Sequence, residues 1–294
     1  MRITNKLNLP TPLVSMAMEN YQVQPNEYRV TSLLKGIRET ILERRHGDEI
    51  EQDVSDMIWL LFGTAVHNVL EHHIEGDREL KEERIKAEIE GYILSGKFDL
   101  YNDETETVSD YKTCSVWKVI YGDYTDWRRQ LLIYCYILRS IGFHASNGEI
   151  VALMKDYSKR DAKLKDNYPQ FPVQKIEFHF TDEDFSGIEV WLSDTFNEIR
   201  RCENLPDDKL PICTSEERYN SGDKYAVMKN GRKTALRVLD TEEEAKACME
   251  FMKGDYIETR CGEDKKCNEY CNVNKYCSYY QSKNGGVSSS ESQF

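Results

Sequence analysis

Two runs of strand-forming residues, 88–102 and 107–112, lie on either side of the turn-forming tripeptide Asn102-Asp103-Glu104. This pattern predicts a β-hairpin, with Asp99 on its first strand and Asp110 on its second. Because side chains alternate between the two faces of a strand, Asp110 and Lys112 are expected to project from the same face. One carboxylate and one ammonium group are therefore expected to face the same site, with Asp99 on the neighbouring strand.

Asp99 and Asp110 offer hard oxygen ligands, which divalent cations such as Mg²⁺ prefer. An ammonium group beside them could activate water or stabilise charge that develops on a phosphate, and the sequence leaves both roles open for Lys112. The combination suits metal-dependent hydrolysis of a phosphodiester bond. An isolated D-x-K is more often a solvated edge strand, so the flanking elements have to support the interpretation.

The chain has 294 residues, 39% of them apolar, which is enough to bury a sizeable core. Its net charge of −13 argues against a protein that coats nucleic acid over its whole surface, because such binding depends on Lys and Arg. Any contact with DNA must be local. Basic clusters occur at 44–46, 128–129, 155–165 and 229–233, and an ordinary solvated surface is the simplest explanation of each.

The N-terminal residues lack the apolar segment of a signal peptide, and the longest apolar run, 57–62, is too short to span a bilayer. We therefore expect a cytoplasmic protein with no membrane partner. Its oligomeric state is not encoded in any recognisable pattern.

Helical spacing of apolar residues predicts one helix over 31–45, capped by Thr31, and a second over 56–74. The apolar stripe of the second helix comprises Ile58, Leu61, Phe62, Val66, Val69, Leu70 and Ile74. His67 and Glu71 are four residues apart on this helix and share a face. His67 is a candidate third metal ligand, and mixed nitrogen and oxygen coordination suits Mn²⁺ somewhat better than Mg²⁺. Glu71 could bind the metal or hold a neighbouring group.

A further helix is predicted over 125–141, with Gln130 and Tyr134 one turn apart. Both could reach the metal centre or a DNA phosphate, although a core position is equally expected for Tyr134. Strands at 149–155 and 174–180 and a helix at 182–201 follow. This order of elements predicts an α/β fold with a mixed central sheet flanked by helices.

The motifs G-T-x-x-H-x-x-x-E, G-x-x-D, D-Y-K-T and Q-x-x-x-Y, in this order, resemble the PD-(D/E)XK nuclease superfamily. More narrowly, they resemble its RecB-like exonuclease branch, found in recombination enzymes, CRISPR adaptation nucleases and bacteriophages. The resemblance covers residues 28–200 and implies a restriction-endonuclease-like core. It also implies that His67, Asp99, Asp110 and the Tyr111 backbone carbonyl hold the metal, that Lys112 is the catalytic lysine, and that Gln130 and Tyr134 support the site.

The C-terminal region opens with a predicted hairpin, in which strands 224–229 and 232–239 flank Asn230-Gly231. A helix then starts at Thr241, where Glu244 completes a capping box, and continues to about residue 252. Four cysteines follow within 260–280, namely Cys261, Cys267, Cys271 and Cys277. In an intracellular chain this density favours metal binding over disulfides, and free thiols in a loop are the simpler alternative.

The spacing C-x3-C-x5-C is similar to the C-x2-C-x5-C tail with which some RecB-like nucleases hold a four-iron four-sulfur cluster through one distant fourth cysteine. Cys213 is the favoured fourth ligand because of that arrangement and because it would close a long loop, with Cys261 as the alternative. Four thiolates fit either an iron–sulfur cluster or Zn²⁺.

These features divide the chain into an irregular N-terminal arm (1–27), a nuclease core (28–205), a cysteine-containing appendage (206–281) and a disordered tail (282–294). We expect a divalent-metal-dependent DNA exonuclease, and the resemblance implies a role in recombination, repair or phage DNA metabolism. The rivals are a structure-specific or restriction-type endonuclease and a non-catalytic module that binds DNA ends or assembles a complex. No helicase motif is present, so unwinding would need a partner such as a helicase or recombination protein.

Overall fold

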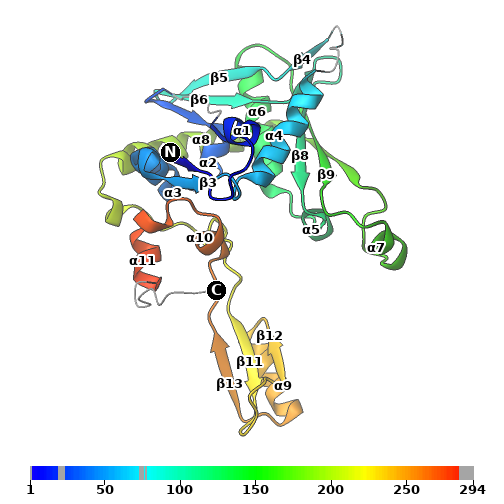
Figure 1. The fold of residues 1–294 in the computed structure, drawn as a ribbon, viewed down its shortest axis with the longest axis vertical. Helices are drawn as coiled ribbons and strands as arrows, with labels where there is room; N and C mark the ends of the chain where they lie inside the picture. Colours follow the sequence, from blue (N-terminus) through cyan, green and yellow to red (C-terminus); the bar gives the residue numbers. More distant parts are fainter. Residues whose placement is uncertain (1, 19–23, 73–75, 77, 285–294) are drawn as a thin grey trace. The chain divides into compact units, whose positions relative to one another are not determined.

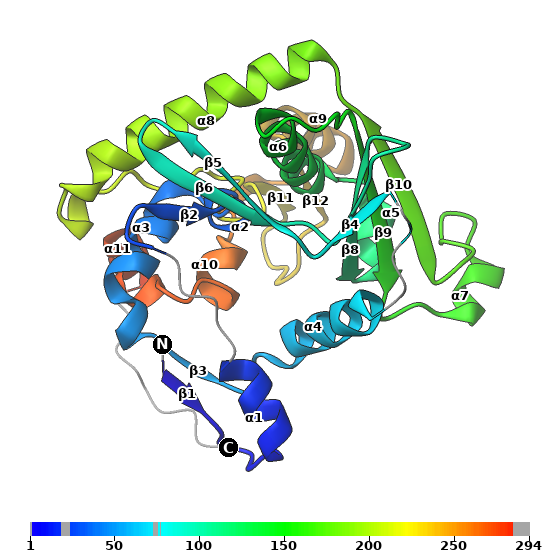
Figure 2. The ribbon, with the colours of Figure 1, turned by 90° about the horizontal axis from the view of Figure 1, so that it is seen from above.

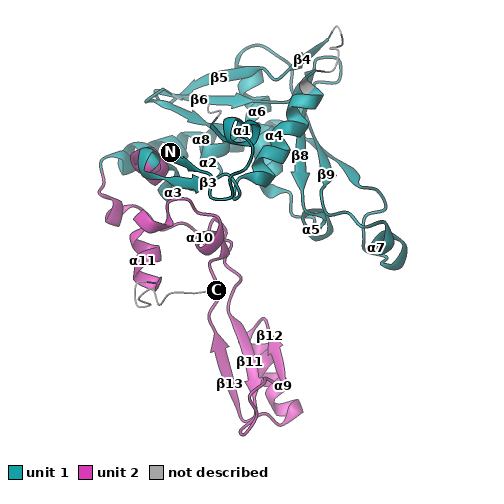
Figure 3. Cartoon of the chain, viewed as in Figure 1, with its two compact units in different colours: residues 1–40, 47–204 teal, residues 41–46, 205–294 magenta. Residues whose placement is uncertain are grey.

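The computed structural model describes residues 2–18, 24–72, 76 and 78–284. The chain forms two compact units (Figure 3). Unit 1 comprises residues 1–40 and 47–204, and unit 2 comprises residues 41–46 and 205–294. Helix α3 (Ile37–His46) belongs to both, because its first turn lies in unit 1 and the rest lies in unit 2.

The larger sheet of unit 1 has five strands in the order β10-β9-β8-β7-β4 (Figure 1). They are β4 (Glu79–Lys81), β7 (Leu100–Asn102), β8 (Thr107–Cys114), β9 (Asn147–Met154) and β10 (Val173–His179). Strands β8 and β9 run parallel, and the other neighbours are antiparallel. The chain crosses from β8 to β9 through α5 (Val116–Tyr121) and α6 (Thr125–Ser140), since parallel strands need a long connection. This is the mixed sheet flanked by helices that the sequence predicts.

A second sheet of three strands has the order β2-β6-β5, with β2 (Glu27–Arg29), β5 (Arg84–Ile89) and β6 (Tyr92–Lys97). Strands β4 and β5 form one arm of a long hairpin, and β6 and β7 form the other. Both arms pass from the small sheet to the large one at the same point of the hairpin. The last pair in the small sheet is Arg84 with Lys97, and the first pair in the large sheet is Lys81 with Leu100. The hairpin therefore kinks where the two sheets meet.

Helix α6 forms the centre of unit 1. It lies between the two sheets and α8 (Asp182–Glu203) (Figure 2). Its core-facing side chains, Leu131, Ile133, Cys135, Ile137 and Leu138, are fully buried. Each buried aliphatic side chain of this size contributes about 1.5–3 kcal/mol through loss of water contact, so this helix is a main source of stability. Helix α8 starts with a capping box between Thr181 and Asp184.

The helix predicted over 31–45 is in fact two, α2 (Val30–Leu33) and α3. Gly36 has a φ of 106°, which an α-helix cannot accommodate, and it interrupts the helix at this point. Thr31 lies inside α2 and therefore does not cap a helix start, so that prediction was wrong.

The N-terminal arm is not irregular. Strand β1 (Arg2–Thr4) pairs in parallel with β3 (Glu51–Asp53), and the short helix η1 (Gly47–Glu49) precedes β3. Helix α1 (Thr11–Met18) packs through Ala17 against Leu61 of α4 (Ile58–Glu71). The predicted stripe of α4 is only partly buried, since Leu61 is 4% exposed but Phe62 is 47% and Val69 is 74% exposed. Ile74 lies outside the described residues.

Unit 2 contains a three-stranded antiparallel sheet, β12-β11-β13, and the helix α9 (Glu242–Met252). Its strands are β11 (Lys224–Met228), β12 (Arg237–Leu239) and β13 (Tyr256–Arg260). The predicted hairpin is present, but its connection is longer than two residues, because Val227 pairs with Arg237. The Thr241 hydroxyl caps α9 by accepting the Glu244 backbone N–H at 3.2 Å, which is one of the two hydrogen bonds of the predicted capping box.

The rest of unit 2 consists of short helices, namely η2 (Asp207–Lys209), α10 (Lys265–Glu269), η3 (Asn274–Tyr276) and α11 (Ser278–Asn284). In unit 1, the segment between β9 and β10 holds the basic cluster 155–165 and contains α7 (Lys159–Leu164). The predicted disordered tail begins too early, because residues 282–284 belong to α11. The rest of that prediction lies outside the described residues. Within the described part of the chain, no helix has the length and apolar character needed to cross a membrane.

Candidate metal centre

The kink of the long hairpin brings two acidic residues face to face. Glu82 lies in the link between β4 and β5, and Asp99 lies in the link between β6 and β7. The register on either side of the break sets these two residues opposite each other, and the Glu82 N–H donates to the Asp99 carbonyl at 3.1 Å. The sequence predicted that Asp99 lies on a strand. This prediction was wrong, because the chain changes sheets at this position.

Helix α4 adds His67 to these two carboxylates. His67 Nδ1 is 2.9 Å from Asp99 Oδ1 and 3.9 Å from Glu82 Oε1. One ligand atom from each of the three residues lies within 4.8 Å of the others. The hydrogen bond to Asp99 raises the pKa of His67, and nearby Asp110 and Glu82 add to the rise. Sequence analysis missed Glu82, whose only signal is its position opposite Asp99 in the register.

Asp110 and Lys112 occupy the same face of β8. Lys112 Nζ is 2.7 Å from Asp110 Oδ2, and the Asp110 side chain is almost fully buried. Burial raises the pKa of Asp110, while the adjacent lysine opposes that rise. On the other carboxylate oxygen, Gln130 Nε2 donates to Asp110 Oδ1 at 3.1 Å. The same amide donates to the Tyr134 hydroxyl at 2.9 Å, so α6 holds Asp110 through a hydrogen-bonded chain.

Two motif glycines explain how these elements approach so closely. A Cβ on Gly96 of β6 would lie 2.5 Å from Tyr134 Cε1, closer than real Cβ contacts allow. A Cβ on Gly63 of α4 would lie 3.2 Å from Thr113 Oγ1 of β8. Gly96 thus leaves room for the α6 ring beside the hairpin. Gly63 lets the helix that carries His67 lie against the strand that carries Asp110.

The donor set fits a divalent cation. An imidazole and two carboxylates converge, and such mixed nitrogen and oxygen ligands suit Mn²⁺ or Mg²⁺. Asp110 Oδ2 is buried and lies within ion-pair distance of Lys112, but among the described residues it finds no hydrogen-bond donor of normal geometry. An oxygen in that condition retains a lone pair for a cation. Asp110 does not belong to the tight group formed by His67, Glu82 and Asp99, although it is near enough to perturb the pKa of His67.

Two predicted ligands remain predictions. The Tyr111 N–H donates to Asp99 Oδ2 at 2.6 Å, which links β8 to the kink, but this contact does not test its carbonyl as a ligand. Glu71 is the last residue of α4, and its side chain lies outside the described part of the structure.

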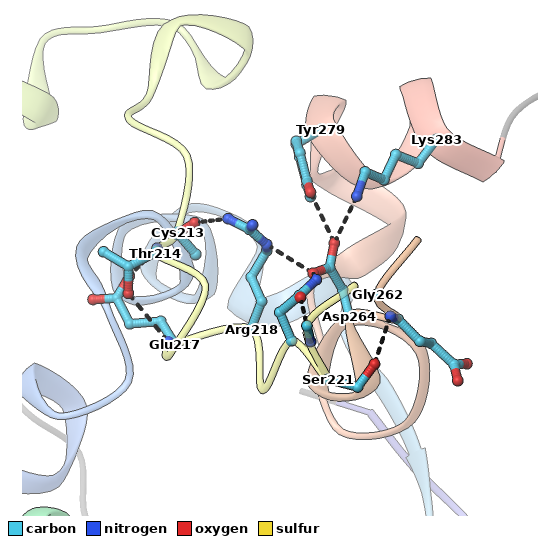
Figure 4. A network of polar contacts seen from close by, with 12 residues as sticks. Cys213, Thr214, Glu217, Arg218, Ser221, Gly262, Asp264, Tyr279 and Lys283 are labelled. Atoms are coloured by element: carbon cyan, nitrogen blue, oxygen red, sulfur yellow. Dashed lines mark hydrogen bonds and ion pairs between the residues drawn. The ribbon is translucent and has the colours of Figure 1, made fainter. Parts of the chain in front are cut away.

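In unit 2, a polar network joins the segments that carry the cysteines (Figure 4). The Arg218 side chain donates to the Cys213 carbonyl and, at 3.0 Å, to Asp264 Oδ1. Asp264 Oδ2 accepts from the Tyr279 hydroxyl at 2.8 Å and from Lys283 Nζ at 3.1 Å. The network therefore ties the Cys213 loop to the residues that flank the predicted ligands Cys267, Cys271 and Cys277. Cys261 is exposed. A shared thiolate site remains a prediction.

No family model matches this chain, and no curated protein does. Among solved structures, a protein designated SSO0001 aligns with a TM-score of 0.47 and 18% identity, over 67% of this chain and 85% of that one. An alkaline exonuclease from Laribacter hongkongensis aligns with a TM-score of 0.37 and 11% identity, over 60% of this chain and 89% of that one. A phage-related exonuclease from Haemophilus somnus 129PT aligns with a TM-score of 0.34 and 12% identity, over 64% and 98% of the respective chains. At these scores the likeness is not evidence for a shared activity.

Proposed function

We propose that this protein is a divalent-metal-dependent deoxyribonuclease that hydrolyses phosphodiester bonds. The observation that carries the proposal is the convergence of His67, Glu82 and Asp99 at the kink where the two sheets meet, next to the ion pair between buried Asp110 and half-buried Lys112. Residues from a helix, from two inter-sheet links and from a strand meet here. A carboxylate that is buried beside a lysine and a histidine is typical of a functional site and not of a solvated acidic surface.

A divalent cation held by His67, Asp99 and Asp110, with Glu82 beside them, would supply the Lewis acidity that phosphodiester hydrolysis needs. Lys112 carries its ammonium group on the same face of β8 as Asp110, so it is placed to stabilise negative charge that develops on a phosphate or to orient a water. Gln130 and Tyr134 act as positioning residues, because they hold Asp110 and do not themselves present a charge to the substrate.

We further propose that the substrate is DNA and that cleavage starts from a DNA end. Both points are supported by the resemblance of the four motifs to RecB-like exonucleases. The negative net charge agrees with substrate contact at limited sites. An endonuclease with the same chemistry is the alternative, and covalently closed circular DNA separates the two because it offers no end.

The test compares linear and closed circular DNA with Mg²⁺, with Mn²⁺ and with excess chelator. Wild-type protein is expected to degrade linear DNA only when metal is present. Asp110→Asn and Lys112→Ala should each lower the rate at least about 100-fold while leaving the fold intact. Glu83→Gln is the matched control, because Glu83 is exposed and adjacent to the site. Undiminished cleavage by both site variants would refute the proposed centre.

We further propose that Cys213, Cys267, Cys271 and Cys277 hold a four-iron four-sulfur cluster or Zn²⁺. The network through Arg218 and Asp264, which joins the Cys213 loop to the segment containing the other three, supports this set over one with Cys261. Anaerobically purified protein should contain stoichiometric iron or zinc by elemental analysis. An absorption band near about 400 nm would identify iron and sulfur, because Zn²⁺ has no such transition. Metal-free protein with an unchanged unit 2 would exclude the site.

A further inference from the structure

The structure separates the basic clusters of the sequence by whether their charge is neutralised within the chain. Arg45 and His46 both pair with Asp207, at 2.5 and 2.7 Å, inside unit 2. Arg128 pairs with Asp184 at 2.7 Å in unit 1. The 155–165 cluster contains Asp156 and Asp161, and Lys165 pairs with Asp161 at 3.3 Å, although its other cations make no ion pair within the described residues. These clusters are at least partly compensated.

The remaining cluster is not compensated. It lies in residues 229–237, the connection from β11 into the first residue of β12, which we call the basic loop. The basic loop contains Lys229, Arg232, Lys233 and Arg237 and no acidic residue. All four side chains are exposed, and within the part of the chain that the structure describes none of them makes an ion pair.

Neighbouring cations on the same small sheet and helix behave differently. Lys224 pairs with Asp240, Lys246 pairs with Glu242 at 2.7 Å, and Arg260 pairs with Glu258 at 2.7 Å. Acidic residues are therefore available nearby, yet the basic loop projects its charge without them. In a chain of net charge −13, this is a localised positive surface.

Backbone contacts hold the basic loop in one conformation. Gly231 adopts a φ of 81°, and the Arg232 N–H donates to the Lys229 carbonyl at 3.0 Å, which closes a turn. At its base, the Asn230 N–H donates to Asp255 Oδ2 at 2.7 Å and the Leu236 N–H donates to the Val227 carbonyl at 2.8 Å. A turn ordered before binding loses less conformational entropy when a partner docks.

We propose that the basic loop binds the phosphate backbone of DNA, and so gives unit 2 a substrate-holding role separate from the metal centre. Arginine and lysine neutralise phosphates, and the arginine fork suits phosphate oxygens in particular. The tip of the loop, residues 229–234, has no apolar side chain, whereas protein interfaces have an apolar core. The choice of DNA over another polyanion rests on the proposed nuclease function.

The test measures the binding of a fluorescent 30-base-pair duplex by anisotropy, between 0.05 and 0.2 M salt, without divalent metal. The full-length protein carries Asp110→Asn to prevent cleavage. The loop variant adds Arg232→Gln, Lys233→Gln and Arg237→Gln. The control variant adds Lys224→Gln, Lys246→Gln and Arg260→Gln, which remove the same charge from paired positions of the same sheet and helix.

If each loop cation neutralises one phosphate, the slope of log affinity against log salt falls by up to about 3 in the loop variant. The same relation sets an upper bound of about 500-fold weaker binding at 0.1 M salt, and we expect at least about tenfold. The control variant should bind within about threefold of the parent, because a paired surface cation contributes little. Arg232→Lys with Arg237→Lys should retain the salt slope of the parent, since it retains the charge.

Equal affinity and slope in the loop and control variants would overturn the proposal, as would a parent protein that binds no DNA. Far-ultraviolet circular dichroism checks that the loop variant is folded, which its exposed and unpaired positions lead us to expect. The two proposals fail separately. The wild-type protein could lack nuclease activity while the loop variant still loses DNA binding. That result would refute the metal-centre chemistry and support the basic loop as a DNA-binding site.

Discussion

Substituting Gly96 by alanine tests how the two halves of the candidate site are packed. The added Cβ would lie 2.5 Å from Tyr134 Cε1, 2.9 Å from Tyr134 Cδ1 and 3.1 Å from a Val30 methyl group. The Tyr134 side chain is only 2% exposed, and its hydroxyl accepts the hydrogen bond from Gln130. The ring therefore has no free volume to enter and cannot move without disturbing the residues that hold Asp110.

The net effect is a balance of two terms. Alanine is favoured over glycine inside a strand by about 0.5–1 kcal/mol, because it loses less backbone entropy. Overpacking a filled core costs about 1–3 kcal/mol, and an overlap this severe belongs at the upper end. We expect the free energy of unfolding to fall by about 2 kcal/mol, which for a unit of this size lowers the melting temperature by about 4–8 °C.

Tryptophan fluorescence during urea unfolding is the suitable assay, because Trp59, Trp117, Trp127 and Trp191 are the four tryptophans of the chain and all lie in unit 1. Gly187→Ala is the matched control. Gly187 is exposed in α8 with nothing within 4 Å of an added Cβ, so alanine should stabilise that helix by about 1 kcal/mol.

A double-mutant cycle isolates the cause. In a Tyr134→Leu background the clashing ring atoms are gone, so Gly96→Ala should cost little further stability. Equal costs in both backgrounds would refute the proposed clash. So would a Gly96→Ala variant that is as stable as the wild type.

The remaining predictions concern half-buried Glu82 and the buried residues Asp264 and Tyr101. Glu82→Gln should weaken Mn²⁺ binding about 10- to 100-fold in calorimetry, while exposed Glu83→Gln leaves it unchanged; equal affinities would remove Glu82 from the site. Asp264→Asn should destabilise unit 2 by about 3 kcal/mol, seen as faster amide exchange there but not in unit 1, because Arg218 loses a buried partner. Burial alone would raise the pKa of Asp264, but its hydrogen bonds lower this pKa. The contribution of the Asp264 carboxylate to the stability of unit 2 should therefore persist to pH values well below 4 and be lost only in strong acid. Burial and nearby Asp103 raise the pKa of Tyr101 to about 12, so its stabilising effect is complete below about pH 10 and is lost as the pH rises to about 12. In Tyr101→Phe, the free energy of unfolding measured with urea should depend less on pH across that range. A pH dependence equal to that of the wild type would contradict the role given to Tyr101.

Local periodicity was enough to predict several parts of the site. Asp110 and Lys112 share a face because strand side chains alternate, and they lie 2.7 Å apart. Gln130 and Tyr134 share a face because they are one helical turn apart, and they are hydrogen-bonded at 2.9 Å. The cap of α9 at Thr241 likewise depends only on residues three positions apart.

Features that depend on distant partners were missed or wrong. Nothing in the neighbourhood of Glu82 marks it as a site residue, because its position opposite Asp99 follows from the register of a hairpin that changes sheets. The apolar stripe of α4 predicted burial, but α1 and the sheet cover only part of it, and Phe62 and Val69 remain exposed.

The sequence by itself determined which side chains share a face of a strand or helix, since backbone geometry repeats every two or 3.6 residues whatever surrounds it. The tertiary contacts were needed to show that Glu82 joins His67 and Asp99, that Asp99 lies at a crossing between sheets, and that Arg45 and Arg128 are paired with acidic residues while the cations of the basic loop are not. These outcomes depend on strand register and on contacts between residues far apart in the chain. Local pattern restricts the register within a hairpin, but it does not show which distant residues meet.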